Sequence, residues 1–392
     1  MKMNQTITTR HFISQSTLSA YLLATTFFIY SAGLLDVIMH SEGLKIYLDI
    51  ARALTLLFFL FLSINITPYN SKGVMLCLYA LLSIVIFHDM FILEATTGTL
   101  VALTIYQKNT TQYIRLSIIA TLIVVIPAMA LAKTGVINSV VFVPPNAEDK
   151  VLTAASKDTF GFWHPNQITL LVAGCLLASF YINNRKLILI CFATYLVLLS
   201  STISRTFLPI PIMIFLFIIL PTNYKIFRSL FLWLTLAISF TSTLISLITS
   251  LPFFVKSILT PDAYVAADKI LSYRLQIIER HMQNLNLFEL TTGWSSTKLE
   301  IDSAYINMIF SQGYLVYLAV TIGLLCIQYI AVRKKMLKEA MIIALFMLTS
   351  NFETPVGASS LLFIVSAICI ISVIKHRNKR HSPASMIPAR HS

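Results

Sequence analysis

Two arginines of this sequence lie where a guanidinium could bind a phosphate group. Arg205 follows the hydroxyl-rich run 200–204 between two short apolar stretches, and Arg274 lies in a polar segment near residue 270. Guanidinium groups bind phosphate oxygens through paired, charge-assisted hydrogen bonds. An arginine at or below a membrane surface is costly unless it is paired or faces water, which makes Arg205 a functional candidate. The alternative is that its long side chain only reaches the lipid headgroups.

Four further polar residues are candidates for a functional site beside these arginines. His164 lies in the aromatic segment 160–166, whose proline suits the first turn of a helix and whose rings suit a membrane interface. Asn166 in the same segment could bind a sugar or a phosphate. Asp302 precedes an apolar run, where its alternative role is to cap a helix. His281, in the polar segment after Arg274, is the fourth of these residues.

The segment around Arg274 has the spacing of a short amphipathic helix. Five apolar residues recur at intervals of three and four: Leu271, Leu275, Ile278, Met282 and Leu285. Such a helix is too short and too charged to span a bilayer, which predicts that it lies at the outer membrane surface. At about 100° per residue, Arg274 and His281 flank the apolar stripe and Arg280 points away from it. Arg274 is therefore better placed than Arg280 to face a ligand, unless both are merely solvated.

The elements that must position these residues are membrane helices. Hydrophobic residues make up 57% of the 392 positions and charged residues 11%, less than half of the roughly 25% in soluble domains. Apolar runs of about 20 residues recur along the chain, and each can cross a hydrocarbon core of about 30 Å. Because lipid offers no partner to free backbone groups, these runs must be helical. We therefore predict an all-α, polytopic membrane bundle.

We expect about twelve transmembrane helices in a single membrane domain, residues 1–392. Their approximate ranges are 18–39, 46–66, 73–88, 90–106, 115–133, 165–182, 187–203, 206–220, 229–250, 304–331, 339–351 and 358–374. With the N-terminus inside, most of the 29 lysines and arginines fall in short inside connectors, as the positive-inside rule requires. Both termini are then cytoplasmic, including a basic tail at 375–392. The long loops 133–165 and 251–303 lie outside, and Glu353 also lies toward that side.

The inside connectors contain no glycine-rich phosphate loop, no paired acids and no cluster of metal ligands. The five cysteines all lie in apolar runs, so neither a disulfide framework nor a zinc site is expected. In a membrane protein the net charge of +13 reflects the connectors rather than nucleic-acid binding. A reaction at the outer face must then draw its energy from the substrate, as a lipid diphosphate with an activated leaving group would provide.

Four short motifs occur together in the second half of the chain. They are the segment 161–166 with its His-Pro-Asn, the hairpin Ser204–Thr206, the loop from Ser272 to Trp294, and Asp-Ser-Ala-Tyr at 302–305 followed by Gly313. In order and spacing they resemble the superfamily of O-antigen and capsule polymerases and O-antigen ligases. The resemblance covers roughly residues 161–325, whereas the first five helices match only in hydropathy.

This resemblance implies a metal-independent glycosyltransferase that moves a glycan from an undecaprenyl-diphosphate carrier to a sugar hydroxyl at the outer face of the bacterial inner membrane. It implies no cofactor. The predicted catalytic residues are Arg205, Arg274, His164 and Asp302, with the two arginines holding the diphosphate. The resemblance also implies a base that deprotonates the acceptor hydroxyl, and the sequence does not choose among His164, His281 and Asp302. The predicted substrate-binding residues are Arg280, His281, Asn166, Trp294 and Tyr305. The expected partners are the lipid-linked oligosaccharide, membrane lipid, and flippase and chain-length regulator proteins, without nucleic acid.

Polymerases and ligases of this superfamily share one chemistry and differ in the acceptor. Ligases usually carry a histidine late in the outer loop, where this chain reads Asp-Ser-Ala-Tyr at 302–305. The resemblance therefore favours a polymerase of O-antigen, capsule or exopolysaccharide repeat units, while His281 keeps a ligase open. The rival from another class is a lipid-linked glycan flippase, which would place charge near the bilayer midplane on broken helices. A structural scaffold is the third alternative.

Overall fold

The computed structural model describes most of the chain after residue 89. The described residues are 24, 54, 90–107, 109–137, 141–142, 157–162, 165–202, 206–220, 224–271, 274–283, 285, 287–292, 303–355 and 360–378. They are almost all helical, and the strands β1 (Val141–Phe142) and β2 (Lys157–Asp158) form one short antiparallel pair. Apart from two single helical positions, the predicted spans 18–39, 46–66 and 73–88 lie outside the described residues.

Nine helices of the described part lie where spans were predicted. They are α4 (Met90–Gln107), α5 (Thr110–Lys133), α6 (Pro165–Tyr181), α7 (Arg185–Thr202), α8 (Pro209–Ile219), α9 (Lys225–Ser250), α14 (Ala304–Arg333), α15 (Leu337–Thr349) and α16 (Leu361–Asn378). Within the described residues, α5, α9 and α14 are long and apolar enough to cross a membrane, and α6, α8 and α16 contain shorter apolar helices. The described chain is thus a helical bundle with three candidate membrane spans.

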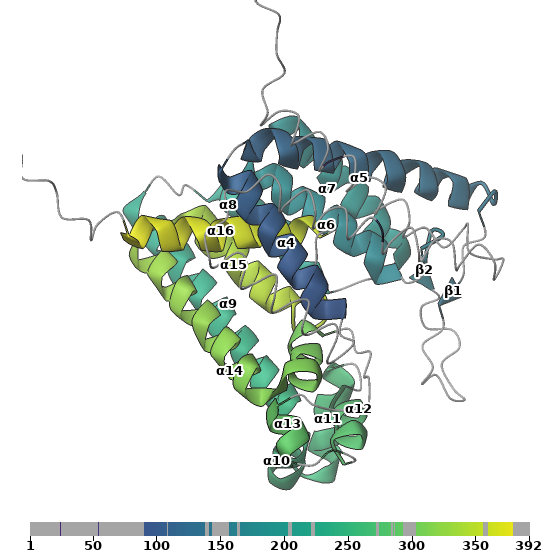
Figure 1. Cartoon of the computed structure of the whole chain (residues 1–392). Coiled ribbons are helices and arrows are strands. Elements are labelled where there is room, and N and C mark those ends of the chain that lie inside the picture. Colours follow the sequence, from purple (N-terminus) through teal and green to yellow (C-terminus); the bar gives the residue numbers. More distant parts are fainter. Residues whose placement is uncertain are drawn as a thin grey trace, which may run out of the picture.

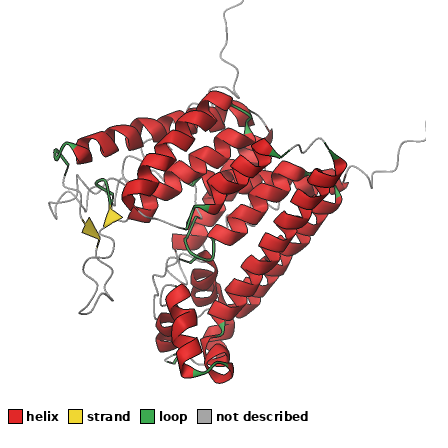
Figure 2. Ribbon diagram, turned by 180° about the vertical axis from the view of Figure 1, so that it is seen from behind, coloured by secondary structure: helices red, strands yellow, loops and turns green. Residues whose placement is uncertain are grey.

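The helices pack against neighbours that run in both directions. Helix α9 packs against α14 and α15, α6 against α5, α7 and α16, and α16 against α4. Figure 1 shows α9 and α14 running side by side from one end of the bundle down to a group of short helices, α10–α13. The view from behind in Figure 2 shows the same pair leading to that group. The largest apolar core lies among α4–α8, α15 and α16.

One end of the bundle gathers basic side chains from several helix ends. The Lys375 ammonium of α16 lies 4.4 Å from the ring centre of Tyr106 in α4. Lys338 Nζ at the start of α15 lies 2.5 Å from the Asn183 side-chain oxygen after α6. Arg228 near the start of α9 donates to the Lys335 carbonyl at 2.7 Å, in the turn between α14 and α15. We call this end, where α4, α6, α14 and α16 finish and α7, α9 and α15 begin, the basic end.

The opposite end holds the four short helices of residues 251–303, which we call the cap. They are α10 (Pro252–Ile258), α11 (Pro261–Ile270), α12 (Arg274–Met282) and α13 (Leu287–Thr292). The predicted apolar stripe is buried at Leu275, Ile278 and Met282. The helix itself is shorter than the stripe suggested, because Leu271 ends α11 and Leu285 follows α12. Ile278 and Met282 pack against the first turns of α14, so the cap rests on a membrane-length helix.

Helix α9 buries its polar face and exposes its apolar one. Its buried polar residues are Thr235, Ser239, Ser242, Thr243, Ser246, Thr249 and Ser250. Ser246 shares a hydrogen bond of 2.7 Å with the Tyr317 hydroxyl of α14, and Asn351 donates to Ser242 Oγ at 2.7 Å. Trp233 of the same helix is 61% exposed. An apolar surface around a hydrogen-bonded interior is what a lipid environment favours.

Helix α14 is broken near its cap end. Gly313 has φ 82° and ψ 167°, a backbone conformation that is essentially restricted to glycine. The break separates residues 304–312 from 314–333. Directly after it, the Tyr314 hydroxyl donates to the Ser250 carbonyl at the end of α9. The orientation of the first two turns of α14, and of the cap packed on them, therefore depends on this glycine.

Candidate functional site

The described residues include five of the nine predicted site residues. These are Arg274, Arg280, His281, Asn166 and Tyr305. Arg205, His164, Asp302 and Trp294 lie outside the described residues, so their roles stay predictions. The alternative role of Asp302 as a helix cap is wrong, because α14 begins at Ala304 and its N-cap is Ser303, whose hydroxyl accepts from the Ile306 N–H at 3.4 Å.

Arg274 links the cap to the membrane helices. It is the first residue of α12 and is half-buried. Its Nη2 donates to the Phe352 carbonyl at 2.7 Å, and its Nη1 donates to the Leu271 carbonyl at 3.3 Å. The guanidinium carbon also lies 5.7 Å from the ring centre of Phe352. These contacts fix the charge of Arg274 at the junction of α12 with the turn that follows α15.

This turn, Ser350–Pro355, joins helix ends that are far apart in sequence. Asn166 in the first turn of α6 donates to Glu353 Oε1. The Ala304 N–H at the start of α14 donates to the Ser350 and Glu353 carbonyls at 3.0 and 3.1 Å. Asn307 donates to Thr354 Oγ1 at 3.2 Å. The 350–355 turn thus brings the starts of α6, α12 and α14 to one place.

Glu353 is the residue at this place to which the sequence assigned no role. Its side chain is 7% exposed and accepts from the Asn166 amide. It lies beside the N-terminal ends of α6 and α14, where the helix dipole favours a negative charge. The signal available in the sequence is a lone acid in Ser-Asn-Phe-Glu-Thr-Pro between two apolar runs. An ionised carboxylate is an acceptor only, and so it can take a proton from a hydroxyl group.

The two basic residues at the end of α12 lie as the helical spacing indicated. Arg280 is exposed, whereas His281 is half-buried with its ring centre 6.5 Å from that of Phe310. His281 Nδ1 lies 2.9 Å from the Ile277 carbonyl oxygen. Because a carbonyl only accepts, this geometry assigns the proton to Nδ1 and leaves Nε2 as the acceptor in the neutral ring. His281 therefore stays a candidate base.

Tyr305 lies in the packing between α14 and the cap. Its side chain is 2% exposed and belongs to the cluster that includes Ile278 and Met282. Its ring centre lies 6.1 Å from that of Tyr317. Its predicted contact with substrate is not tested by this position and stays a prediction.

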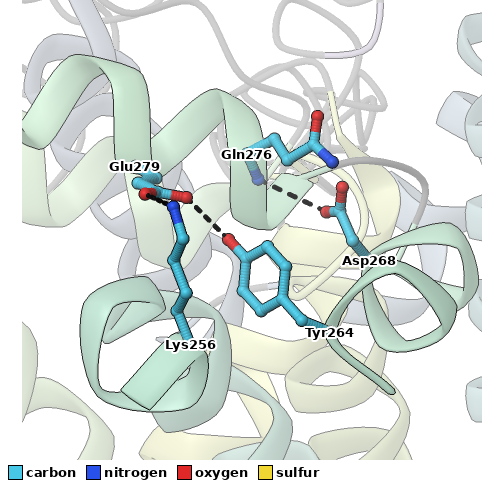
Figure 3. Close-up of polar contacts among 5 residues, drawn as sticks. All are labelled: Lys256, Tyr264, Asp268, Gln276 and Glu279. Atoms are coloured by element: carbon cyan, nitrogen blue, oxygen red, sulfur yellow. Dashed lines mark hydrogen bonds and ion pairs between the residues drawn. The ribbon is translucent and has the colours of Figure 1, made fainter. Parts of the chain in front are cut away.

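A polar cluster inside the cap fixes the start of α12 (Figure 3). Lys256 Nζ of α10 lies 2.5 Å from Glu279 Oε1, and the Tyr264 hydroxyl of α11 donates to Glu279 Oε2 at 2.9 Å. Asp268 of α11 accepts from the Leu275 N–H at 2.8 Å and the Gln276 N–H at 3.4 Å. Asp268 thus caps α12 from another helix. Because α12 begins at Arg274, this cluster holds the backbone from which the guanidinium extends.

Compared with protein-family models, with curated proteins and with solved structures, the chain matches none. The assignment of a function therefore depends on the chemistry of the residues themselves.

Burial acts differently on the two acids of the cap. For Glu279, burial raises the pKa, but hydrogen bonds from Lys256 and Tyr264 and the charge of Lys256 outweigh it, so the pKa lies below its ordinary value. For Asp268, burial raises the pKa above its ordinary value, and the two N–H groups of α12 offset only part of this effect. The Oδ2 atom of Asp268 is buried without a hydrogen-bond partner among the described residues. Glu279 therefore stabilises the cap when it is ionised, whereas ionised Asp268 destabilises it.

The cap end combines a cation, a carboxylate and an amide within reach of one turn. Arg274 contacts the carbonyl of Phe352, the residue before Glu353, and Asn166 contacts the Glu353 carboxylate. A guanidinium suits an anionic phosphate oxygen, and a carboxylate suits a hydroxyl proton. Among the described residues, no three His, Cys, Asp or Glu side chains are grouped as a metal site. The chemistry that these side chains offer is binding of a phosphate group by the guanidinium and removal of a hydroxyl proton by the carboxylate.

Proposed function

We propose that this chain is a polysaccharide polymerase at the outer face of the bacterial inner membrane. It transfers a glycan from undecaprenyl diphosphate to a sugar hydroxyl of a lipid-linked repeat unit. The bond between the anomeric carbon and the diphosphate oxygen breaks, and a glycosidic bond to the acceptor oxygen forms. The acceptor proton passes to a base, and undecaprenyl diphosphate leaves with the bonding electrons. No nucleotide, metal or other cofactor is part of this proposal.

The observation that carries the proposal is Arg274 fixed beside Asn166 and Glu353 at the cap end. Stabilising the charge of the departing diphosphate is the main electrostatic task of such a transfer. We assign this task to Arg274 together with Arg205, with Arg280 as a lesser contributor. His164, His281 and Asp302 remain candidates for the base, and the buried carboxylate of Glu353 joins them.

The distribution of charge supports the orientation in this proposal. The basic end gathers lysines and arginines from α7, α9, α14, α15 and α16, and Glu339 is the acid described there. Such an excess favours the cytoplasmic side of a bacterial inner membrane. The cap end, with Arg274 and Glu353, then faces outward, where flipped lipid-linked repeat units are met. About twelve spans with both termini cytoplasmic complete the proposed topology.

Two observations favour alternative functions, a ligase and a transporter. His281 lies in the cap with an acceptor nitrogen, as an O-antigen ligase would need for its acceptor. The break of α14 at Gly313 is a feature of transporters, which bind substrates at discontinuous helices. Cells without a flippase accumulate lipid-linked repeat units inside, whereas cells without a polymerase accumulate single units outside. The site of accumulation in a deletion strain therefore separates these classes.

The test is surface polysaccharide length in a deletion strain complemented at matched membrane levels. Arg274→Ala is expected to reduce long chains about 100-fold, because it removes a group that stabilises the leaving diphosphate. Arg274→Lys is expected to restore only part of the ladder, since an ammonium lacks the paired geometry of guanidinium. The matched control is Lys269→Ala, which removes an exposed cation of the cap and is expected to leave the ladder unchanged.

Each other outcome has a definite meaning. A ladder that is unchanged in Arg274→Ala would contradict the role of Arg274 and favour a scaffold. Loss of all attached glycan, with carrier-linked polymer accumulating outside, would identify a ligase. Repeat units that accumulate inside would identify a flippase.

A further inference from the structure

A cavity of about 380 Å³ opens at the basic end, at the opposite end of the bundle from the residues assigned to catalysis. Its lining residues come from three elements: Tyr106 of α4, Met336 of the turn between α14 and α15, and Ser372, Lys375 and His376 of α16. They combine one fixed cation with an imidazole, two hydroxyl groups and a thioether. This is a donor-rich set, which suits an anion.

The cation of this cavity is positioned by its neighbours. Lys375 Nζ lies 4.4 Å from the ring centre of Tyr106, within the range of a cation–π contact. Lys334 Nζ donates to the Val373 carbonyl at 3.3 Å, which brings a second ammonium to the same stretch of α16. The acid described at this end, Glu339, follows Lys338 in the chain, and Lys338 offsets its charge. The surroundings of the cavity are therefore net positive.

Exposed apolar side chains also occur on the last turns of α14 and α16, outside the lining of the cavity. Ile374 precedes Lys375 in α16 and is 45% exposed, and Tyr329 of α14 is 48% exposed. Both residues lie within the last turns of apolar helices, at the level where a membrane core gives way to headgroups. An anion bound in the cavity would therefore lie at the headgroup level of a membrane.

We propose that this cavity binds the phosphate of an anionic phospholipid headgroup. Basic pockets between transmembrane helices on the cytoplasmic side are suited to such headgroups. Lys375 supplies the charge, and Ser372 and Tyr106 supply hydroxyl donors. The inference rests on the proposed orientation of the basic end and is independent of the proposed transfer reaction at the cap end.

The experiment measures binding to the purified full-length chain in a neutral detergent. The probes are short-chain phosphatidylglycerol, short-chain phosphatidylcholine and inorganic phosphate, each titrated while the thermal unfolding midpoint is followed. We expect saturable stabilisation by phosphatidylglycerol and none by phosphatidylcholine. Lys375→Ala is expected to weaken the apparent Kd for phosphatidylglycerol about fivefold, as removal of one cation near a lipid phosphate predicts.

The matched control removes a cation from the same end but outside the cavity. Lys186→Ala in the first turn of α7, which is exposed, is expected to keep the wild-type Kd. If Lys375→Ala fails to fold, Lys375→Gln keeps a polar stem over Tyr106 and is measured instead. Equal weakening in the Lys186 and Lys375 variants would overturn the proposal in favour of a diffuse surface charge. Stabilisation by inorganic phosphate as strong as by phosphatidylglycerol would overturn the lipid assignment in favour of free phosphate.

Discussion

Glu279 and Asp268 lie in the same cap, and their contributions to its stability depend on pH in opposite ways. The lowered pKa of Glu279 means that its contribution is complete above the unfolded-state pKa of about 4.3 and is lost as the pH falls through the folded-state pKa. The raised pKa of Asp268 means that its contribution is complete below about 3.9 and is lost as the pH rises through the folded-state pKa. At neutral pH, Glu279 therefore stabilises the cap and the charge of Asp268 opposes it.

Neutral substitutions at these two acids should change the stability of the cap in opposite directions. Glu279→Gln removes a charge-assisted contact with Lys256 and should cost about 1 kcal/mol at pH 7, a modest value because the Lys256 side chain is 57% exposed. Asp268→Asn keeps an oxygen to accept the α12 N–H groups but removes a buried charge, and should stabilise the cap at pH 7. The measurement is amide hydrogen exchange of residues 274–282 in the detergent-purified chain, followed from pH 7 to well below the ordinary pKa of a glutamate, about 4.3.

These two variants are each other's control, since both change one buried acid to its amide. Glu279→Gln should also abolish the loss of protection that wild type shows as the pH falls below about 4.3. Faster exchange in both variants at pH 7 would contradict the opposite electrostatic roles of the two acids.

At the residue scale, local spacing predicted directions but not partners. The helical period correctly indicated that Arg280 is exposed and that Arg274 lies on another side of α12. It could not indicate that Arg274 contacts Phe352, which lies 78 positions further along the chain. The hydrogen bond between Asn166 and Glu353, which are 187 positions apart, could not be predicted from this spacing either. Such contacts depend on how helices pack, and a single sequence carries no direct record of that packing.

At the element scale, the break in α14 provides a sharp test of one glycine. The Gly313→Ala variant must place a side chain at φ 82° and ψ 167°, which costs about 1–3 kcal/mol, or else straighten the helix. Either response disturbs residues 304–312, on which the cap packs. We expect a lower thermal unfolding midpoint and faster proteolysis within residues 251–303 in Gly313→Ala.

Gly323 of the same helix is the matched control. A Cβ atom built on Gly323 meets nothing within 4 Å, and its backbone is helical. Gly323→Ala should therefore be neutral or stabilise α14 by about 0.5–1 kcal/mol. Equal behaviour of the Gly313 and Gly323 variants would show that the break is not required for the position of the cap.

The positions of the long helices were predictable from the sequence. The polar face of α9 and the short helices of the cap were predictable only in part. Apolar length located the nine helices of the described bundle, because an uninterrupted apolar run has few alternatives to a helix. The polar face of α9 was visible as Ser and Thr at 239, 242, 243, 246 and 250, yet an average over the run hides it. Of the four short helices of the cap, the sequence predicted only α12, and α10 and α13 have 7 and 6 residues, too few to show a helical period.

At the scale of the whole molecule, the charge asymmetry between the two ends makes a topological prediction. The basic end carries Arg185, Lys186, Arg333, Lys334 and Lys335 at adjoining helix ends, whereas the cap also carries acids such as Asp262, Asp268 and Glu279. Each short basic connector adds to the same bias, so no single residue decides the orientation. The prediction therefore concerns the entire bundle, and it determines on which side of the membrane Arg274 and Glu353 can act.

Cysteine labelling in cells tests this orientation directly. Lys269 in the cap and Lys186 at the basic end are both exposed, so each can be replaced by cysteine with little effect on packing. With the outer membrane permeabilised, a membrane-impermeant maleimide should label Lys269→Cys in intact spheroplasts and label Lys186→Cys only after the inner membrane is disrupted. Wild type gives the background from the natural thiols, of which Cys175, Cys191 and Cys369 are buried and Cys326 lies within α14. The reverse pattern would place the cap in the cytoplasm, where no flipped substrate is present, and a transfer reaction at the outer face would then be impossible for Arg274.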